Sequence, residues 1–212
     1  SIGAGLQGGG VYAVEMLENG EFIAGGSFDS SGDVTLNGIA RWTGSEWAPI
    51  GEGIGKSAVL YALARMPNGD LIAAGSFSTV GGVPCNNIAR WDGVQWSPLG
   101  AGTDGSIYAL AVLPNGDLVA GGYFQSASGL AAPMIARWDG AQWISMGAPD
   151  NTVESLLVLP SGELAVGGRF QLPFKYIALW NNGVWYSFGS LNSSVSRICR
   201  LPDGEVYALG GF

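Results

Sequence analysis

The side chains that could do chemistry in this chain are mainly carboxylates, because its 212 residues include 17 aspartates and glutamates but no histidine. Without histidine the chain has no Ser-His-Asp triad, no Cys-His pair and no histidine metal site. Two carboxylates at a suitable separation are enough for a glycosidase, but most of these residues fall in turns, where hairpin chemistry explains them. We therefore expect a protein that is not an enzyme, with a polysaccharide-active enzyme that uses paired carboxylates as the remote alternative.

One segment, "DSSGDVTLN" at 29–37, holds three oxygen-bearing side chains that could bind calcium, namely Asp29, Asp33 and Asn37. Their four-residue spacing differs from the alternate-residue pattern of a calcium loop, so a solvated turn is the favoured interpretation. No other cofactor or metal is expected.

Three further carboxylates occupy similar places in successive segments of the chain: Glu52, Asp104 and Asp150. They could form an acidic ring that binds a ligand, or they could simply face solvent as a rim. Together with Asp29 and Asp33 they are the candidate ligand-binding residues.

The eight tryptophans form four pairs, and the members of each pair are always five residues apart. Aromatic platforms bind sugars, and a site repeated in this way would suit a multivalent lectin. Rigid repetition of the positions favours a structural role in packing instead. The pairs are Trp42/Trp47, Trp91/Trp96, Trp138/Trp143 and Trp180/Trp185.

A repeat of a dozen residues must position these side chains. "LPNGDLVAGGYF" at 113–124 has close counterparts at 17–28, 66–77, 159–170 and 201–212, and the apolar residue that opens each copy recurs after 49, 47, 46 and 42 residues. Periods of this size with strand character are typical of propeller blades. Asn-Gly or Asp-Gly between apolar runs predicts a tight hairpin in which both central residues adopt positive φ.

Each copy divides into four short strands, and the second strand ends in a glycine pair such as Gly25-Gly26, Gly121-Gly122 or Gly167-Gly168. The third and fourth strands form the hairpin that carries the tryptophan pair. We expect the glycine pair where neighbouring sheets approach closely. Arg41, Arg90 and Arg137 precede the first tryptophan, and we expect each to stack on an aromatic ring or to pair with a carboxylate.

This pattern of a glycine pair followed by a tryptophan hairpin resembles the kelch-type repeat and the central propeller of galactose oxidase. The segments "GGSF" and "NIARWDGVQWSPLG" are still more similar to tandem surface repeats of bacteria and of fungal cortical marker proteins. The resemblance covers essentially the whole chain and implies an all-β propeller, but the fold hosts enzymes, adaptors and adhesins alike. The copper-site histidines of galactose oxidase have no counterparts here.

We predict a single propeller domain over 1–212 with repeats at about 2–49, 50–98, 99–145, 146–187 and, in part, 188–212. This gives four complete four-stranded blades and the inner hairpin of a fifth. We expect the chain to be part of a longer one. A missing segment or a partner chain would supply the remaining strands of the fifth blade, and closure would give five blades.

The composition limits the classes of partner that the protein is expected to bind. A net charge of −8 argues against nucleic acid, and no apolar run is long enough to span a membrane. Two cysteines, Cys85 and Cys199, make no disulfide framework. Few lysines and many Ser, Thr, Asn and Trp residues favour an extracellular or cell-surface protein.

Function is expected on the face that carries the variable loops, since loops on a rigid scaffold usually hold binding residues. These loops join the second strand to the third and the fourth strand to the next blade. We expect a binding or structural module that presents them for protein interaction or adhesion. The alternative is a multivalent carbohydrate-binding propeller, which should repeat its polar contact residues in every blade, as these loops do not.

Overall fold

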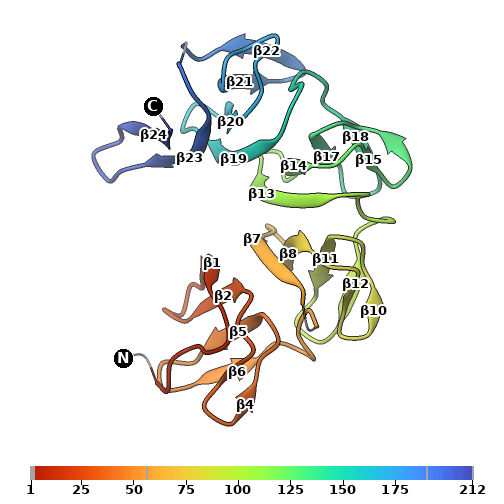
Figure 1. Ribbon diagram of the computed structural model, residues 1–212, viewed down its shortest axis with the longest axis vertical. Helices are drawn as coiled ribbons and strands as arrows, with labels where there is room; N and C mark the ends of the chain where they lie inside the picture. Colours follow the sequence, from red (N-terminus) through yellow and green to blue (C-terminus); the bar gives the residue numbers. More distant parts are fainter. Residues whose placement is uncertain (1–2, 56, 190, 212) are drawn as a thin grey trace. The chain divides into compact units, whose positions relative to one another are not determined.

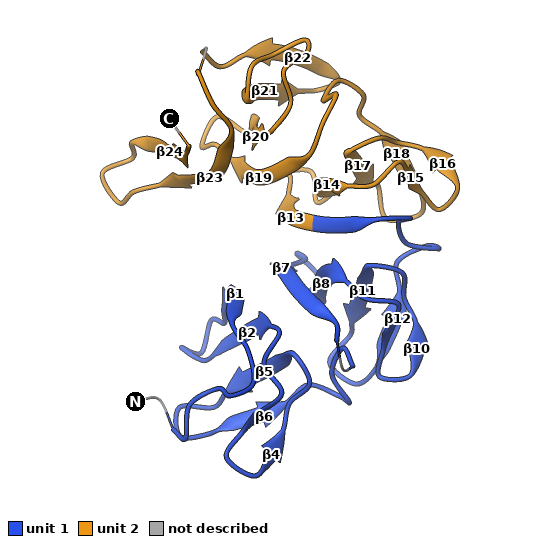
Figure 2. Ribbon diagram, in the orientation of Figure 1, with its two compact units in different colours: residues 1–107 blue, residues 108–212 orange. Residues whose placement is uncertain are grey.

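The computed structural model describes residues 3–55, 57–189 and 191–211, and within these ranges every regular element is a β-strand (Figure 1). The chain forms two compact units, 1–107 and 108–212 (Figure 2). The predicted fold is confirmed, because the sheets form four four-stranded antiparallel blades and one further hairpin.

The first unit contains two blades, with strand orders β1-β2-β5-β6 and β7-β8-β11-β12. In each blade the four strands follow one another along the chain, so that the first strand lies at one edge and the fourth at the other. Their bounds are Val11–Met16 (β1), Phe22–Gly26 (β2), Ile39–Trp42 (β5), Trp47–Pro49 (β6), Val59–Arg65 (β7), Leu71–Ser76 (β8), Ile88–Trp91 (β11) and Trp96–Pro98 (β12).

Most of the third blade, the fourth blade and the last hairpin make up the second unit. The sheets have the orders β13-β14-β17-β18, β19-β20-β21-β22 and β23-β24. The bounds are Ser106–Val112 (β13), Leu118–Tyr123 (β14), Ile135–Trp138 (β17), Trp143–Ser145 (β18), Val153–Val158 (β19), Leu164–Gly168 (β20), Ile177–Asn181 (β21), Val184–Ser187 (β22), Val195–Arg200 (β23) and Val206–Gly210 (β24).

The turn between the first two strands differs from the prediction in one detail. Gly116 has a φ of 89°, but Asn115 does not adopt a positive φ. The Asn115 side chain instead accepts a hydrogen bond from the Asp117 N–H at 3.1 Å, and the Gly116 N–H donates to the Leu113 carbonyl at 2.9 Å. Asparagine therefore stabilises this turn through its side chain, and only glycine adopts the left-handed conformation.

The hydrophobic core lies between neighbouring blades. In the first unit Ile23 of β2, Leu60 of β7 and Leu71 of β8 belong to one buried cluster. The first glycine of the pair makes this packing possible, because a Cβ on Gly25 would lie 2.3 Å from a Leu60 methyl group. In the second unit a Cβ on Gly167 would lie 2.6 Å from Val195. The predicted close approach at the glycine pair is confirmed.

The second glycine of the pair faces a β-bulge in the first strand. The register shifts between Val11 and Ala13, and the same shift recurs in β7, β19 and β23. A Cβ on Gly26 would lie 2.0 Å from the Gly10 carbonyl oxygen, and one on Gly168 would lie 2.1 Å from that of Thr152. Only glycine lets the bulged backbone come this close.

The arginines that precede the first tryptophan of a pair bind carboxylates, as one of the two expected arrangements predicts. Arg41 lies 2.7 Å from Glu21 and Arg90 lies 2.7 Å from Asp70, while Arg137 pairs with Asp117. Each acid stands just before or at the start of the second strand. Both cysteines are free thiols, and Cys85 is buried.

Candidate functional site

The variable loops fold more regularly than the sequence suggested. Three of the four loops between the second and third strands contain a two-residue-per-strand hairpin: Ser30–Ser31 with Val34–Thr35 (β3, β4), Thr79–Val80 with Val83–Pro84 (β9, β10), and Ser126–Ala127 with Leu130–Ala131 (β15, β16). Each small hairpin contacts the fourth strand of its own blade. We call the side of each blade that carries these loops and the loops between blades the loop face, and the opposite side the turn face.

Backbone hydrogen bonds tie the loops of the loop face to one another in the first unit. The Ile54 N–H donates to the Asn37 carbonyl at 2.8 Å, the Gly81 N–H to the Gly53 carbonyl at 2.9 Å, and the Thr103 N–H to the Asn86 carbonyl at 3.0 Å. The Asn37 side chain adds a bond to the Glu52 carbonyl at 2.9 Å. These loops are therefore built as a connected surface.

A polar pocket of about 590 Å³ opens on the loop face of the first unit. Its walls come from the loop before β7, the β8–β11 loop and the loop before β13. Hydroxyl and amide side chains dominate, which suits a ligand that offers many hydrogen-bonding groups. The lining includes Ile54, Ser57, Ser76, Ser78, Thr79, Asn86, Asn87, Thr103 and Asp104.

The residue that each bulge leaves without a register partner places one side chain near the loop-face end of a first strand. In the first unit these are Tyr12 and Tyr61, whose ring centroids lie 5.8 Å apart with a 49° interplanar angle. Tyr12 is 49% exposed. In the fourth blade and last hairpin they are Glu154 and Ser196. Bulges re-aim side chains and are frequent next to binding sites.

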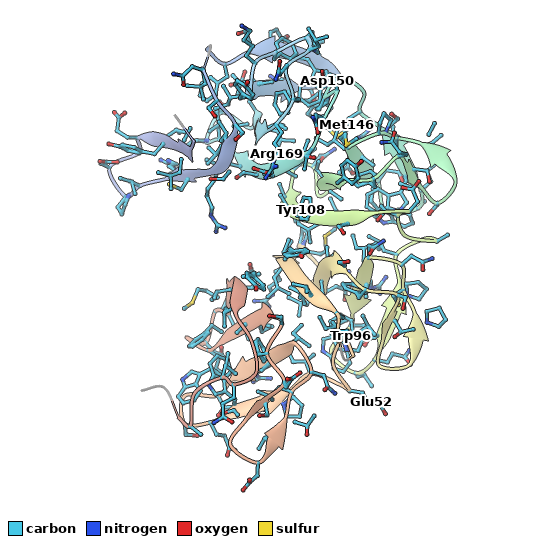
Figure 3. All side chains as sticks on the ribbon, in the orientation of Figure 1. Glu52, Trp96, Tyr108, Met146, Asp150 and Arg169 are labelled. Carbon is cyan, nitrogen blue, oxygen red and sulfur yellow. The ribbon has the colours of Figure 1, made fainter. Side chains whose placement is uncertain are left out.

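An ion pair lies at the bulge of the second unit. Arg169, which is labelled in Figure 3, donates from Nε to Glu154 at 2.6 Å. The hydrogen bond to Glu154 is the largest cause that raises the pKa of Arg169, and the charge of the Glu154 carboxylate and the phenolic group of Tyr108 add to it. Glu154 is mostly covered whereas the Arg169 side chain is 65% exposed, so the ion pair holds an exposed cation in a fixed position.

These bulge residues are functional candidates that the sequence interpretation missed. The signal was present in "VYAV", "LYAL" and "IYAL", where Tyr12, Tyr61 and Tyr108 hold the same place and Glu154 replaces them in "VESL". A tyrosine in an apolar strand is typical of a packed core. Only the register shift shows that this position leaves the regular alternation.

The three calcium candidates are spread along the first small hairpin. Asp29 precedes β3, Asp33 lies in the turn between β3 and β4, and Asn37 follows β4. The Asn37 amide nitrogen is used in the bond to the Glu52 carbonyl. Within the described residues no group of three or more His, Cys, Asp or Glu side chains could hold a metal ion. Calcium binding by Asp29, Asp33 and Asn37 stays a prediction.

The three rim carboxylates occupy different surroundings. Asp104 lines the polar pocket, and Glu52 lines a separate hollow with Thr35 and Gly81. In the second unit Asp150, which is labelled in Figure 3, accepts a hydrogen bond from the Gln171 N–H at 2.8 Å, and this bond holds the start of the loop after β20.

The two members of a tryptophan pair differ in burial in the first three blades, whereas Trp180 and Trp185 of the fourth are both partly exposed. Trp47, Trp96 and Trp143 are 7%, 6% and 4% exposed, whereas Trp42, Trp91 and Trp138 are partly exposed. The Trp96 indole N–H donates to the Ile50 carbonyl of the preceding blade at 3.2 Å. Trp185 makes the same bond to Met146 at 2.9 Å, so these indoles connect neighbouring blades.

Comparison with known proteins identifies the fold. A family model described as a domain of unknown function (DUF5122) beta-propeller matches residues 67–91. No curated protein matches the sequence. Virginiamycin B lyase from Staphylococcus aureus is similar in structure, with a TM-score of 0.62 and 13% identity over 95% of this chain and 63% of that one.

Two other solved structures are similar to this chain. The extracellular domain of a hybrid two-component system protein from B. thetaiotaomicron has a TM-score of 0.59 and 11% identity over 93% of this chain and 26% of that one. YCF48 bound to D1 peptide has a TM-score of 0.58 and 17% identity over 95% of this chain and 60% of that one. The chain thus spans about a quarter to two thirds of these proteins.

The fold is that of a β-propeller. The matched family model, the repeated four-stranded blades and the similar solved structures agree on this class. The finer expectation of a kelch-type or galactose-oxidase-type repeat stays a prediction.

No helix that is long and apolar enough to cross a membrane occurs among the described residues.

Proposed function

We propose that this chain is a non-catalytic binding module of an extracellular or cell-surface protein, and that it holds a polypeptide partner on its loop face. The observation that carries the proposal is the bulge that recurs in β1, β7, β19 and β23 and places one side chain at the loop-face end of each of these strands. These side chains are Tyr12 and Tyr61 in the first unit, and Glu154 and Ser196 in the second. Tyrosine and arginine are the residues that most often anchor protein interfaces.

The loop face supports this role because it is rigid and rich in hydrogen-bonding groups. Its loops are bonded to one another, so little entropy is lost when a partner binds. A peptide backbone needs donors and acceptors, and the pocket that contains Ser57, Asn86 and Thr103 offers both. Among the similar structures, one is described as bound to a peptide and another belongs to a mitotic checkpoint complex.

Four carboxylates already make ion pairs or hydrogen bonds within the chain, and this is consistent with a non-catalytic role. Glu21, Asp70 and Asp117 pair with arginines, and the Asp92 carboxylate accepts the N–H groups of the next turn, both at 2.8 Å. Groups that are committed to such bonds are poor acids and bases at neutral pH.

A displayed peptide library, panned on the purified chain, tests the proposal. Enriched peptides should bind the variant Tyr61→Ala about tenfold more weakly, because the ring that packs beside Tyr12 is an anchor. Tyr186→Ala, an exposed tyrosine on β22, is the matched control and should bind normally. Failure to enrich any peptide, or equal binding by the wild type and Tyr61→Ala, would contradict a loop-face peptide site.

A further inference from the structure

The turn face carries two matching grooves, one in each unit. The first lies between the blades of the first unit and has a volume of about 480 Å³. The second lies between the third and fourth blades in the second unit and has a volume of about 540 Å³. Both volumes are in the range of small-ligand sites.

Equivalent positions of the repeat line the two grooves. Each contains the last apolar residue before the turn of the earlier blade, the arginine of its third strand, the turn glycine of the later blade, and the first tryptophan of that blade with its neighbour. The matching residues are Leu17 and Leu113, Arg41 and Arg137, Gly69 and Gly162, Trp91 and Trp180, and Asp92 and Asn181.

The arginine is fixed in place in both grooves. Arg41 is bound to Glu21 through Nε at 2.7 Å, yet its side chain is 47% exposed. Arg137 is paired with Asp117 and is 25% exposed. A guanidinium has five N–H donors in a planar fork, and one carboxylate uses only part of that capacity. The ion pair therefore orients the fork.

The tryptophan supplies an apolar wall beside this fork. Trp91 and Trp180 are both partly exposed, and Trp91 differs in this from the second tryptophan of its pair, Trp96, which is buried. The residue after each, Asp92 or Asn181, adds an acceptor at the end of the wall. The backbone N–H groups of Gln95 and Val94 lower the pKa of Asp92, so its carboxylate is ionised at neutral pH.

An apolar ring face next to planar donors and a side-chain acceptor is the arrangement that recognises a sugar ring. The C–H groups of a pyranose carry partial positive charge and pack on the electron-rich face of an indole. Its hydroxyl groups donate to carboxylate or amide oxygens and accept from a guanidinium. A small anion fits less well, because each arginine already has a carboxylate partner and the chain has a net charge of −8.

We propose that these two grooves are equivalent binding sites for a neutral pyranose of a glycan. The polar contacts that a multivalent lectin must repeat lie on the turn face, although the loop face was the expected one. This inference is independent of the proposed peptide site, since the two use opposite sides of the blades. Two sites on one chain bind a polymeric glycan more tightly than either site does alone.

A glycan array of neutral oligosaccharides, followed by calorimetric titration of the best saccharide, tests the proposal. We expect two sites per chain, in line with the two grooves. Trp91→Ala and Trp180→Ala should each remove one site, and the double variant should weaken binding to the polymeric glycan about tenfold or more. Tyr186→Ala, an aromatic on β22 outside both grooves, should leave binding unchanged.

A second pair of variants guards against loss of folding. Arg41→Lys and Arg137→Lys keep the charge that pairs with Glu21 and Asp117 but lose the planar fork, and the double variant should also weaken binding about tenfold. An array without any neutral glycan ligand would overturn the proposal. Binding that survives the double tryptophan variant, or that Tyr61→Ala removes instead, would overturn it as well.

Discussion

The glycine pair shows how closely single residues are constrained here. A Cβ on Gly167 would meet a methyl group of Val195 at 2.6 Å, which is a side-chain contact. A Cβ on Gly168 would meet the Thr152 carbonyl oxygen at 2.1 Å, which is a backbone contact. Side chains yield more easily than backbone. The two glycines should therefore respond differently to the same substitution.

We predict that Gly167→Ala lowers the free energy of unfolding by about 1–3 kcal/mol through overpacking, and that Gly168→Ala lowers it further. Adding Val195→Ala should offset part of the Gly167→Ala loss and none of the Gly168→Ala loss. Urea midpoints of the single and double variants measure this coupling. Equal losses for the two glycines would show that the bulge yields as easily as the blade interface.

The buried indoles allow a second matched comparison. Trp96 donates to the Ile50 carbonyl, whereas the indole nitrogen of Trp47 has no partner among the described residues. Replacement by phenylalanine removes the same atoms at both positions. Trp96→Phe should lower the free energy of unfolding by about 0.5–1.5 kcal/mol more than Trp47→Phe, because it removes a hydrogen bond that Trp47 does not make and leaves the Ile50 carbonyl only the longer bond from the Gly53 N–H at 3.4 Å. Urea titration would contradict this if Trp47→Phe proved equally or more damaging.

Among the elements, the loop between the second and third strands closes at one left-handed residue. Asn87, Met134 and Tyr176 have φ values of 64°, 64° and 65° just before their third strands. Each donates its N–H to the phenylalanine carbonyl that ends the second-strand segment. A non-glycine residue in this conformation is strained. The hydrogen bonds to the phenylalanine carbonyls therefore offset this backbone strain and keep the loop closed.

The Asn87 loop separates backbone strain from side-chain bonding. The Asn87 side chain accepts from the Phe77 N–H at 3.2 Å and donates to the Thr103 carbonyl at 2.9 Å. Asn87→Gly should lose these bonds but relieve the strain, while Asn87→Ala should lose them and keep it. Alanine should therefore be less stable than glycine by about 1 kcal/mol in urea titrations. A more stable alanine variant would contradict the assigned conformation.

The strands and blades could be predicted because each copy of the repeat contains the same sequence pattern. The Gly turns, the apolar runs and the tryptophan pairs locate four strands in every copy. The small hairpins such as β3–β4 could not be predicted, because two-residue strands leave no periodicity to read. The prediction of a positive φ at Asn115 was also wrong. The Asn115 side chain instead stabilises the turn by accepting a hydrogen bond from the Asp117 N–H.

The candidate sites were less predictable than the elements. Sequence reasoning proposed Asp104 as a ligand-binding residue, and the structure places it in the lining of the polar pocket. It missed the residue at each bulge, since a one-residue register shift leaves no mark in the composition. Sequence reasoning also assigned a single role to both tryptophans of a pair. Only burial separates Trp91, which lines a groove, from Trp96, which is enclosed.

At the scale of the whole molecule, the absence of histidine from the sequence makes the charge nearly constant around neutral pH. Histidine is the side chain whose ordinary pKa lies between about pH 6 and 8, and burial raises the pKa of the Cys85 thiol further above this range. We predict equal urea midpoints at these two pH values. A clear slope between them would require a strongly shifted group.

Glu15 is one of the carboxylates that change the free energy of unfolding below this range, and its pKa shift is opposite in direction to those of Glu21, Asp92 and Asp139. Burial raises the pKa of Glu15, and the charge of Arg65 only partly lowers it again. A raised folded-state pKa means that the folded protein binds the proton more tightly, so this stabilisation is complete at low pH and is lost as pH rises through the raised value. Glu15→Gln should therefore raise the urea midpoint at about pH 7, and this gain should disappear below about pH 4, where the wild-type carboxyl is protonated in both states. A lower midpoint for Glu15→Gln at neutral pH would show that attraction to Arg65 outweighs the cost of burying the carboxylate.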